Sequence, residues 1–137
     1  MAGDEVRDLV SGDGYVAAHL DAMGDGPGFR KVRRVLEVTA FGVNAVVVPP
    51  GVESGFHYHD EQEEVYFVHQ GRIEFAFGDG SSIVLGPGGF VRVDPATHRK
   101  VRNAGDGDAV YVAVGGKEGY VGRDAHIPEG DQRVRRT

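Results

Sequence analysis

The sequence contains no cysteine. This absence excludes disulfide bonds, thiolate metal ligands and a cysteine nucleophile. No stretch approaches the roughly 20 apolar residues that a membrane-spanning helix needs. The acidic amino terminus, MAGDEVRDLVSGDG, also lacks the apolar run of a secretory signal. We therefore expect a soluble, cytoplasmic protein that has no membrane partner.

Positive charge is scarce as well. The chain has 15 Lys and Arg against 21 Asp and Glu, which gives a formal net charge of −6 at pH 7. This balance disfavours long-range attraction to nucleic acid, so no nucleic-acid partner is expected. The basic clusters Arg30–Arg34 and Arg133–Arg136 are local and are interpreted as solvated surface. The stretches GPGG and GDGPG lack the lysine of a phosphate-binding loop and are therefore interpreted as turns.

What the sequence does contain is glycine and short apolar runs. The length of 137 residues fits one domain, and 22 of them are glycine. Between the glycines lie runs rich in Val, Phe, Tyr and Ile, such as NAVVVPP, EVYFVHQG, RIEFAFG, SIVLG, FVRVDP and AVYVAVGG. Strands separated by turn signals at this spacing predict an all-β sandwich or small barrel. GDGSS at 78–82 is the clearest hairpin turn, because Asp79-Gly80 tolerates positive φ.

Two of these runs differ in how their apolar residues are arranged. In RIEFAFG, Ile73, Phe75 and Phe77 alternate with other residues, so this strand is predicted to bury one face. In EVYFVHQ both faces are largely apolar, which predicts a strand that is covered on both sides. A second sheet, a terminal arm or a partner subunit would provide this cover. Together with the terminal segments, the strand leads us to expect a homodimer, which would also cover exposed sheet edges.

A histidine pair supplies the strongest chemical signal. Residues i and i+2 of a strand project from the same face, so His57 and His59 point the same way. Two imidazoles and a carboxylate form the pattern of open Fe(II) sites, and imidazole also suits Zn, Cu and Ni. The carboxylate candidates are Asp60, Glu61, Glu63 and Glu64. Because residues 60–62 resemble a turn, strand parity cannot choose between Glu63 and Glu64.

The spacing around this pair resembles the first signature motif of the cupin superfamily. Gly51, His57-x-His59, Glu64 and Gly71 fall at the positions of that motif. The resemblance covers roughly residues 40 to 115. It implies a small antiparallel β-barrel of the double-stranded β-helix, or jelly-roll, type. It also selects Glu64 over Glu63, and implies that the histidine pair and Glu64 hold one divalent transition metal (Zn, Fe, Ni, Mn or Cu).

The second cupin motif is only partly present. It has a histidine four residues before an asparagine, and in FVRVDPATHRKVRNAG the asparagine is Asn103 while Arg99 occupies the histidine position. His98 is one residue early. If a bulge near Pro95 shifts the strand, His98 becomes the fourth ligand. If the strand is regular, Arg99 faces the metal position instead, where it pairs with Glu64 or clamps a substrate carboxylate.

We expect residues 1–34 to form an N-terminal arm, 35–115 the barrel, and 116–137 a C-terminal tail. Arg99, Tyr66 and Asn103 are the predicted substrate-binding residues. The resulting hypothesis is a metal-dependent enzyme of the isomerase, lyase or dioxygenase type, acting on a small anionic organic substrate. The alternative is a non-enzymatic module that holds a small-molecule ligand, with or without the metal.

Overall fold

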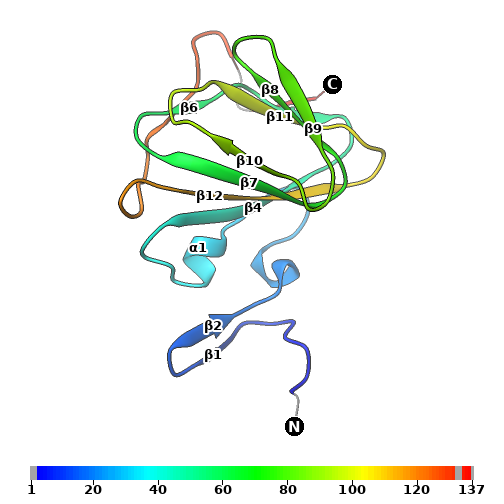
Figure 1. Cartoon of the computed structure of the whole chain (residues 1–137). Coiled ribbons are helices and arrows are strands. Elements are labelled where there is room, and N and C mark those ends of the chain that lie inside the picture. The colour runs from blue at the N-terminus through cyan, green and yellow to red at the C-terminus, as the bar shows by residue number, and fades with distance from the viewer. Residues whose placement is uncertain (1–2, 132–133, 137) are drawn as a thin grey trace.

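Two antiparallel five-stranded sheets face each other and enclose the core (Figure 1). The computed structural model describes residues 3–131 and the backbone of 134–136. The first sheet has the order β10-β7-β12-β4-β3. Its strands are β3 (Gly28–Arg30), β4 (Gly42–Val48), β7 (Glu63–Gln70), β10 (Phe90–Val93) and β12 (Ala109–Gly116). The second has the order β14-β5-β11-β8-β9. Its strands are β5 (Val52–Ser54), β8 (Ile73–Phe77), β9 (Ser82–Leu85), β11 (Arg99–Asn103) and β14 (Val134–Arg136).

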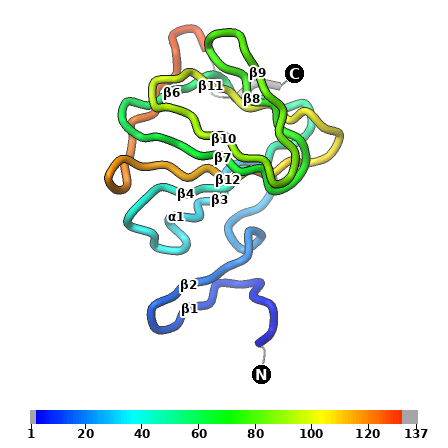
Figure 2. The backbone as a smooth tube through the Cα atoms, in the orientation of Figure 1, coloured from blue at the N-terminus to red at the C-terminus, as the bar shows by residue number. Residues whose placement is uncertain are grey.

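Smaller elements lie around this barrel. They are the hairpin β1 (Val10–Gly12) and β2 (Tyr15–Ala17), the 3-10 helix η1 (Leu20–Met23), the helix α1 (Val32–Val35), and the pair β6 (Tyr58–His59) and β13 (Ala125–His126). Figure 2 shows the β1–β2 hairpin outside the barrel. Among the described residues, no helix is long and apolar enough to cross a membrane. The predicted all-β fold is confirmed.

The core forms where the inward faces of the two sheets meet. The predicted alternation of RIEFAFG is confirmed, since Ile73 and Phe75 are fully buried. They pack with Val68 of β7, Val101 of β11 and Tyr111 of β12. β4 ends at Val48, directly before the two prolines, because neither proline can donate to a ladder. The inward face of each sheet therefore follows from the period-two pattern of its strands.

β7 is apolar on both faces, as its sequence predicts. Tyr66 and Val68 point into the core, while Val65 on the outer face remains 37% exposed. Also on the outer face, the Phe67 ring packs against the exposed Phe90 of the neighbouring strand, with ring centroids 4.6 Å apart. The homodimer stays a prediction.

Both predicted extensions contribute strands to the barrel. β3 extends the first sheet by pairing with β4, and β14 extends the second by pairing with β5. β13 pairs with β6, so the chain after the barrel returns to the segment that carries the histidine pair. The boundaries at 34/35 and 115/116 stay predictions.

One glycine turn in the barrel tolerates no side chain. Gly71 joins β7 to β8 with φ of +77°, and a Cβ there would lie 2.9 Å from Ala109 Cα and Cβ. Gly80 has a similar φ of +91°, but a Cβ there would meet no atom within 4 Å. The two positions therefore share a left-handed backbone and differ in the space around them.

We expect Gly71→Ala to destabilise the protein more than Gly80→Ala. Both substitutions cost about 1–2 kcal/mol for the left-handed backbone, and Gly71→Ala adds about 1–3 kcal/mol because β12 must move. Urea unfolding of the two variants measures the difference in the free energy of unfolding. Equal losses would contradict the close approach of β12 to Gly71.

Candidate metal site

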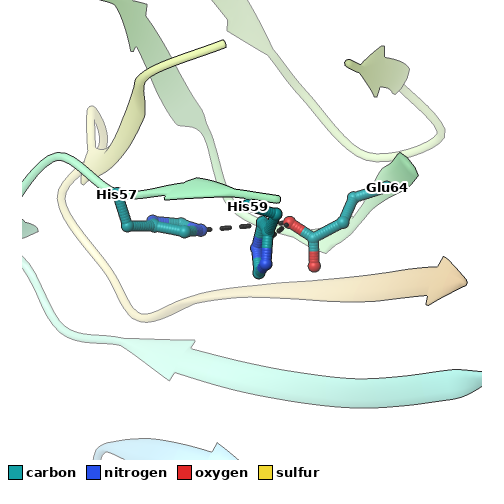
Figure 3. A group of neighbouring side chains, drawn as sticks. All are labelled: His57, His59 and Glu64. Atoms are coloured by element: carbon teal, nitrogen blue, oxygen red, sulfur yellow. Dashed lines mark ion pairs between the residues drawn. The ribbon is translucent and has the colours of Figure 1, made fainter. Parts of the chain in front are cut away.

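Strands of both sheets and the short β6 segment bring three side chains together. His57 directly precedes β6, His59 ends it, and Glu64 lies near the start of β7. The backbone of His57 exchanges two hydrogen bonds with Arg99 of β11, with N···O distances of 2.9 and 3.0 Å. This bridge fixes the histidine segment to the second sheet. Figure 3 shows both rings directed at the carboxylate of Glu64.

The three groups lie at distances suited to a shared cation. His59 Nε2 is 3.1 Å and His57 Nε2 is 3.9 Å from Glu64 Oε1. One ligand atom from each residue lies within 4.8 Å of the others. The exposed fractions of the side chains are 28% for His57, 7% for His59 and 13% for Glu64. The group is therefore mostly enclosed and opens to solvent at His57.

Strand parity settles which glutamate belongs to the group. Glu64 and Tyr66 are two residues apart on β7 and share its inward face, and the Tyr66 hydroxyl donates to Glu64 Oε1 at 2.7 Å. Glu63 points outward, where its carboxylate is 55% exposed and lies 3.9 Å from Arg92.

The Glu64 carboxylate is ionised in spite of its burial. Burial by itself would raise its pKa, but the neighbouring His57 and His59 rings and the hydrogen bond from Tyr66 hold the pKa well below its usual range. Burial, and then the charge of Glu64, raise the pKa of Tyr66 well above its usual value. Tyr66 therefore remains a protonated donor to a charged acceptor.

His59 is oriented by a second carboxylate from the far end of the chain. Its Nδ1 lies 2.8 Å from Asp124 Oδ1. The other oxygen of Asp124 accepts the backbone N–H groups of Glu61 and Gln62 at 2.9 and 3.0 Å. Although burial opposes it, these bonds and that of the Gln62 side chain lower the pKa of Asp124. An ionised Asp124 requires a proton on His59 Nδ1, which leaves Nε2 facing Glu64.

The surroundings of His59 Nε2 indicate whether a metal ion fits this site. This nitrogen is buried and has no hydrogen-bond partner among the described residues. Burial by itself would lower the pKa of His59, but the two carboxylates raise it, so a positive charge is favoured at this atom. Either a proton or a metal ion provides that charge. Two imidazole nitrogens and one carboxylate suit a divalent transition ion, so the residues fit the predicted cofactor.

The structure does not bring His98 to this group. β11 pairs with β8 in a continuous register from Arg99 to Asn103, without the bulge that would turn His98 inward. Its ring instead stacks on Tyr58 outside the barrel, with centroids 4.6 Å apart and planes 7° from parallel. The other alternative, a regular strand in which Arg99 faces inward, describes β11 correctly.

Arg99 occupies the position that faces the site. It is fully buried, and its Nη2 donates to Glu64 Oε1 at 2.8 Å. Its Nη1 donates to the carbonyls of Thr97 and Pro95 at 2.7 and 3.0 Å, and its Nε to the Tyr66 hydroxyl at 3.3 Å. The guanidinium is therefore committed to protein partners. Of its two predicted roles, the geometry corresponds to the pair with Glu64 and not to a clamp on a substrate.

The side chain of Asn103 is also occupied by hydrogen bonds within the protein. Its side-chain amide donates to the carbonyls of Val48 and Gly107 at 2.7 and 2.8 Å, and its side-chain oxygen accepts from Gly105 N at 2.7 Å. These bonds hold the turn that leads from β11 to β12. The side chain faces away from the cavity described next, to which it contributes no lining atoms.

A cavity of about 570 Å³ opens beside the three side chains. His57, His59, Glu64 and Tyr66 lie on its wall. Gly115 of β12 makes room for this end, since a Cβ there would overlap the Gln62 side chain and lie 3.1 Å from Glu64 Cγ. The volume is in the range of small-molecule sites, so a ligand can reach the candidate metal position.

Sequence reasoning missed Asp124 and Gln62. Asp124 lies 65 positions from its partner His59, and its surroundings GRDAH form no recognisable motif. Only the pairing of β13 with β6 brings it to the site. Nothing in the local sequence signals this contact.

Comparison with known families agrees with this architecture. The family model described as "Cupin domain" matches residues 44–115, which is more than half of the chain. The chain therefore belongs to the cupin family, and the predicted resemblance is confirmed. No curated protein matches the sequence.

Solved structures with the same fold support this assignment. A cupin protein from Bacteroides fragilis is 23% identical, with a TM-score of 0.60, 76% of this chain covered and 85% of that chain. An uncharacterized conserved protein with a double-stranded β-helix domain from Klebsiella pneumoniae is 21% identical, with a TM-score of 0.59 and coverage of 66% and 76%.

The DMSP lyase DddQ from Ruegeria pomeroyi DSS-3 is 26% identical, with a TM-score of 0.57. The match covers 66% of this chain but only 45% of the lyase. The chain therefore spans less than half of that enzyme.

We expect Arg99→Met to lower the free energy of unfolding by about 3–5 kcal/mol, because it leaves the buried Glu64 charge without its cation. Adding Glu64→Gln to this variant should recover part of the loss. The measurement is urea unfolding in the presence of a chelator, so that metal binding does not contribute.

Arg102→Met is the matched control. Arg102 lies on the same strand as Arg99, and its guanidinium pairs with Glu74 of the neighbouring β8 at 3.2 Å, but the two side chains are 37% and 26% exposed. An exposed pair contributes about 0–1 kcal/mol. Equal losses for Arg99→Met and Arg102→Met would contradict the central position of the Arg99–Glu64 pair.

Proposed function

We propose that the protein binds one divalent transition metal through His57, His59 and Glu64 and acts as a metal-dependent enzyme on a small organic molecule held in the barrel cavity. The observation that carries this proposal is the buried Nε2 atom of His59. It has no hydrogen-bond partner among the described residues, and it faces a carboxylate oxygen 3.1 Å away.

The chain's own residues divide the work at this site. Asp124 holds the proton on His59 Nδ1 and so keeps Nε2 free to bind a cation. Arg99 Nη2 and the Tyr66 hydroxyl both donate to the Glu64 carboxylate, and Arg99 Nε donates to the Tyr66 hydroxyl. These three bonds fix the orientation of the carboxylate. When bound, the metal supplies Lewis-acid polarisation of a substrate oxygen. His57, the most exposed of the three ligands, lies where substrate enters from the cavity.

Isomerase, lyase and dioxygenase chemistry were the expected reaction types. The similarity to a DMSP lyase at 26% identity favours the lyase type among them. The other similar structures named above carry no activity in their descriptions and support the fold only. The substrate of the lyase is not transferred to this chain, because the match covers less than half of that enzyme.

The Arg99–Glu64 pair favours a second candidate, a non-enzymatic ligand-binding module without metal. The guanidinium already provides a positive charge 2.8 Å from the carboxylate oxygen that a metal would share. A divalent ion next to Arg99 also experiences like-charge repulsion, which lowers its affinity. In this candidate, His59 carries the positive charge as an imidazolium between two carboxylates.

Metal content separates the two candidates. We expect the protein, purified without a histidine tag, to hold one transition-metal ion per chain by elemental analysis. His59→Ala and Glu64→Gln should each lose it, because two remaining ligands cannot retain the ion. His69→Ala, an exposed histidine on the outer face of β7, is the control and should keep it. Wild-type protein that binds no added Zn²⁺ or Mn²⁺ would sink the metal-dependent enzyme and leave the second candidate.

Asp124→Asn tests the orienting carboxylate. We expect it to weaken Zn²⁺ affinity by about 10–100-fold, because the amide no longer favours the required tautomer of His59. The control is Asp60→Asn, since Asp60 pairs with the exposed His126 at 2.7 Å in the same segment pair. Isothermal titration with Zn²⁺ measures both affinities. An unchanged affinity in Asp124→Asn would show that His59 needs no second carboxylate.

A further inference from the structure

The walls of the cavity are apolar along most of its length. Valines from three strands line it, together with Phe56, which follows β5. These are Val46 and Val48 of β4, Val52 of β5 and Val101 of β11. Such walls bury hydrocarbon surface of a ligand and offer few hydrogen-bond partners to it. Recognition of a charged group therefore depends on the few ionisable side chains that line the cavity.

The charges on the cavity wall are unbalanced. Among the described residues that line it, Glu64 is the single carboxylate, and the buried Arg99 behind the wall compensates its charge. Arg33 and Arg123 also line the cavity. No ion pair joins either of them to a carboxylate in the described part of the chain. The excess charge on the cavity wall is thus positive and lies on these two guanidinium groups.

Both arginines belong to segments that lie outside the sheets. Arg33 is half-buried on α1, and its guanidinium carbon lies 4.0 Å from the centroid of the Tyr120 ring. This cation–π contact links α1 to the chain that follows β12. Arg123 lies three residues beyond Tyr120 and is exposed. Because Arg123 is exposed and Arg33 is half-buried, we assign the two guanidinium groups to the solvent-facing rim of the cavity, whereas the histidine–glutamate group comes from the β6 segment and β7.

We propose that the cavity takes an organic carboxylate with an apolar body, whose carboxylate pairs with Arg33 and Arg123 at the rim. The apolar body lies along the valines, and the opposite end reaches His57, His59 and Glu64. Guanidinium groups bind carboxylates through two parallel hydrogen bonds, which matches the free donors of both arginines. The proposal rests on the proposed function, because it names the ligand class of the same cavity. It replaces Arg99 by Arg33 and Arg123 as the groups that recognise the anion.

Three probes separate the contributions of charge and hydrocarbon: 3-phenylpropionate, 3-phenylpropanol and propionate. Isothermal titration of the metal-free protein should give an affinity for 3-phenylpropionate about tenfold higher than for the alcohol, because only the acid pairs with the arginines. Propionate should bind at least tenfold more weakly than 3-phenylpropionate, because it lacks the ring. Equal affinities for the acid and the alcohol would overturn the proposal.

Single substitutions at the rim locate the carboxylate. Arg33→Gln and Arg123→Gln should each lower the affinity for 3-phenylpropionate about three- to tenfold and leave that for 3-phenylpropanol unchanged. Arg34→Gln is the control, since Arg34 is exposed on the same helix and contributes nothing to the cavity wall. An acid affinity that is unchanged in both rim variants, or lowered equally by Arg34→Gln, would overturn the assignment.

The same titrations in His59→Ala distinguish this proposal from the proposed function. If His59→Ala loses the metal but still prefers 3-phenylpropionate to 3-phenylpropanol, this result supports recognition of the carboxylate by Arg33 and Arg123 independently of the metal. A wild-type protein that binds no metal but keeps the arginine-dependent preference would sink the metal-dependent enzyme and support the ligand class. A preference for the acid that requires added Zn²⁺ and His59, and not the arginines, would place the carboxylate at the metal and overturn the ligand assignment.

Discussion

The ionised carboxylate of Glu64 is the group on which the rest of the site depends. A buried charge is stable only when other groups compensate it, and here Arg99, Tyr66 and His59 all direct polar atoms at the same oxygen. Two of these partners make further contacts that hold them in place: Arg99 donates to the carbonyls of Pro95 and Thr97, and His59 contacts Asp124. The site is thus a chain of alternating charges that runs from one sheet to the returning carboxyl-terminal segment.

This chain of charges links the barrel to its extensions. Asp124 lies after the family-matched region, yet it fixes the tautomer of His59 and accepts two backbone N–H groups of the turn before β7. Arg33 precedes the family-matched region and contacts Tyr120, and both residues line the cavity. The segments on either side of the family-matched region therefore complete the site and its cavity. We expect properties that vary among proteins with this fold to depend on such segments, because the sheets themselves are shared.

The replacement of a histidine by Arg99 changes what the site can do. A fourth neutral ligand would add to metal affinity, whereas a guanidinium adds a positive charge beside the ion. The carboxylate is consequently satisfied both with and without a metal. The same burial that makes Arg99 a strong partner for Glu64 removes it from the cavity, which is why we propose Arg33 and Arg123, and not Arg99, for recognition of an anionic ligand.

The sequence by itself determined the main strands, the inward set of side chains on β8 and, through the family motif, the grouping of His57 and His59 with Glu64. These features follow from period-two alternation and from a motif whose residues lie close together in the sequence, on the β6 segment and β7. Only the tertiary structure decided that β11 runs without a bulge, that Arg99 is enclosed, that Asn103 serves a turn, and that Asp124 orients His59. The reason is physical: these outcomes depend on strand register and on contacts across many residues, and local side-chain patterns do not encode either.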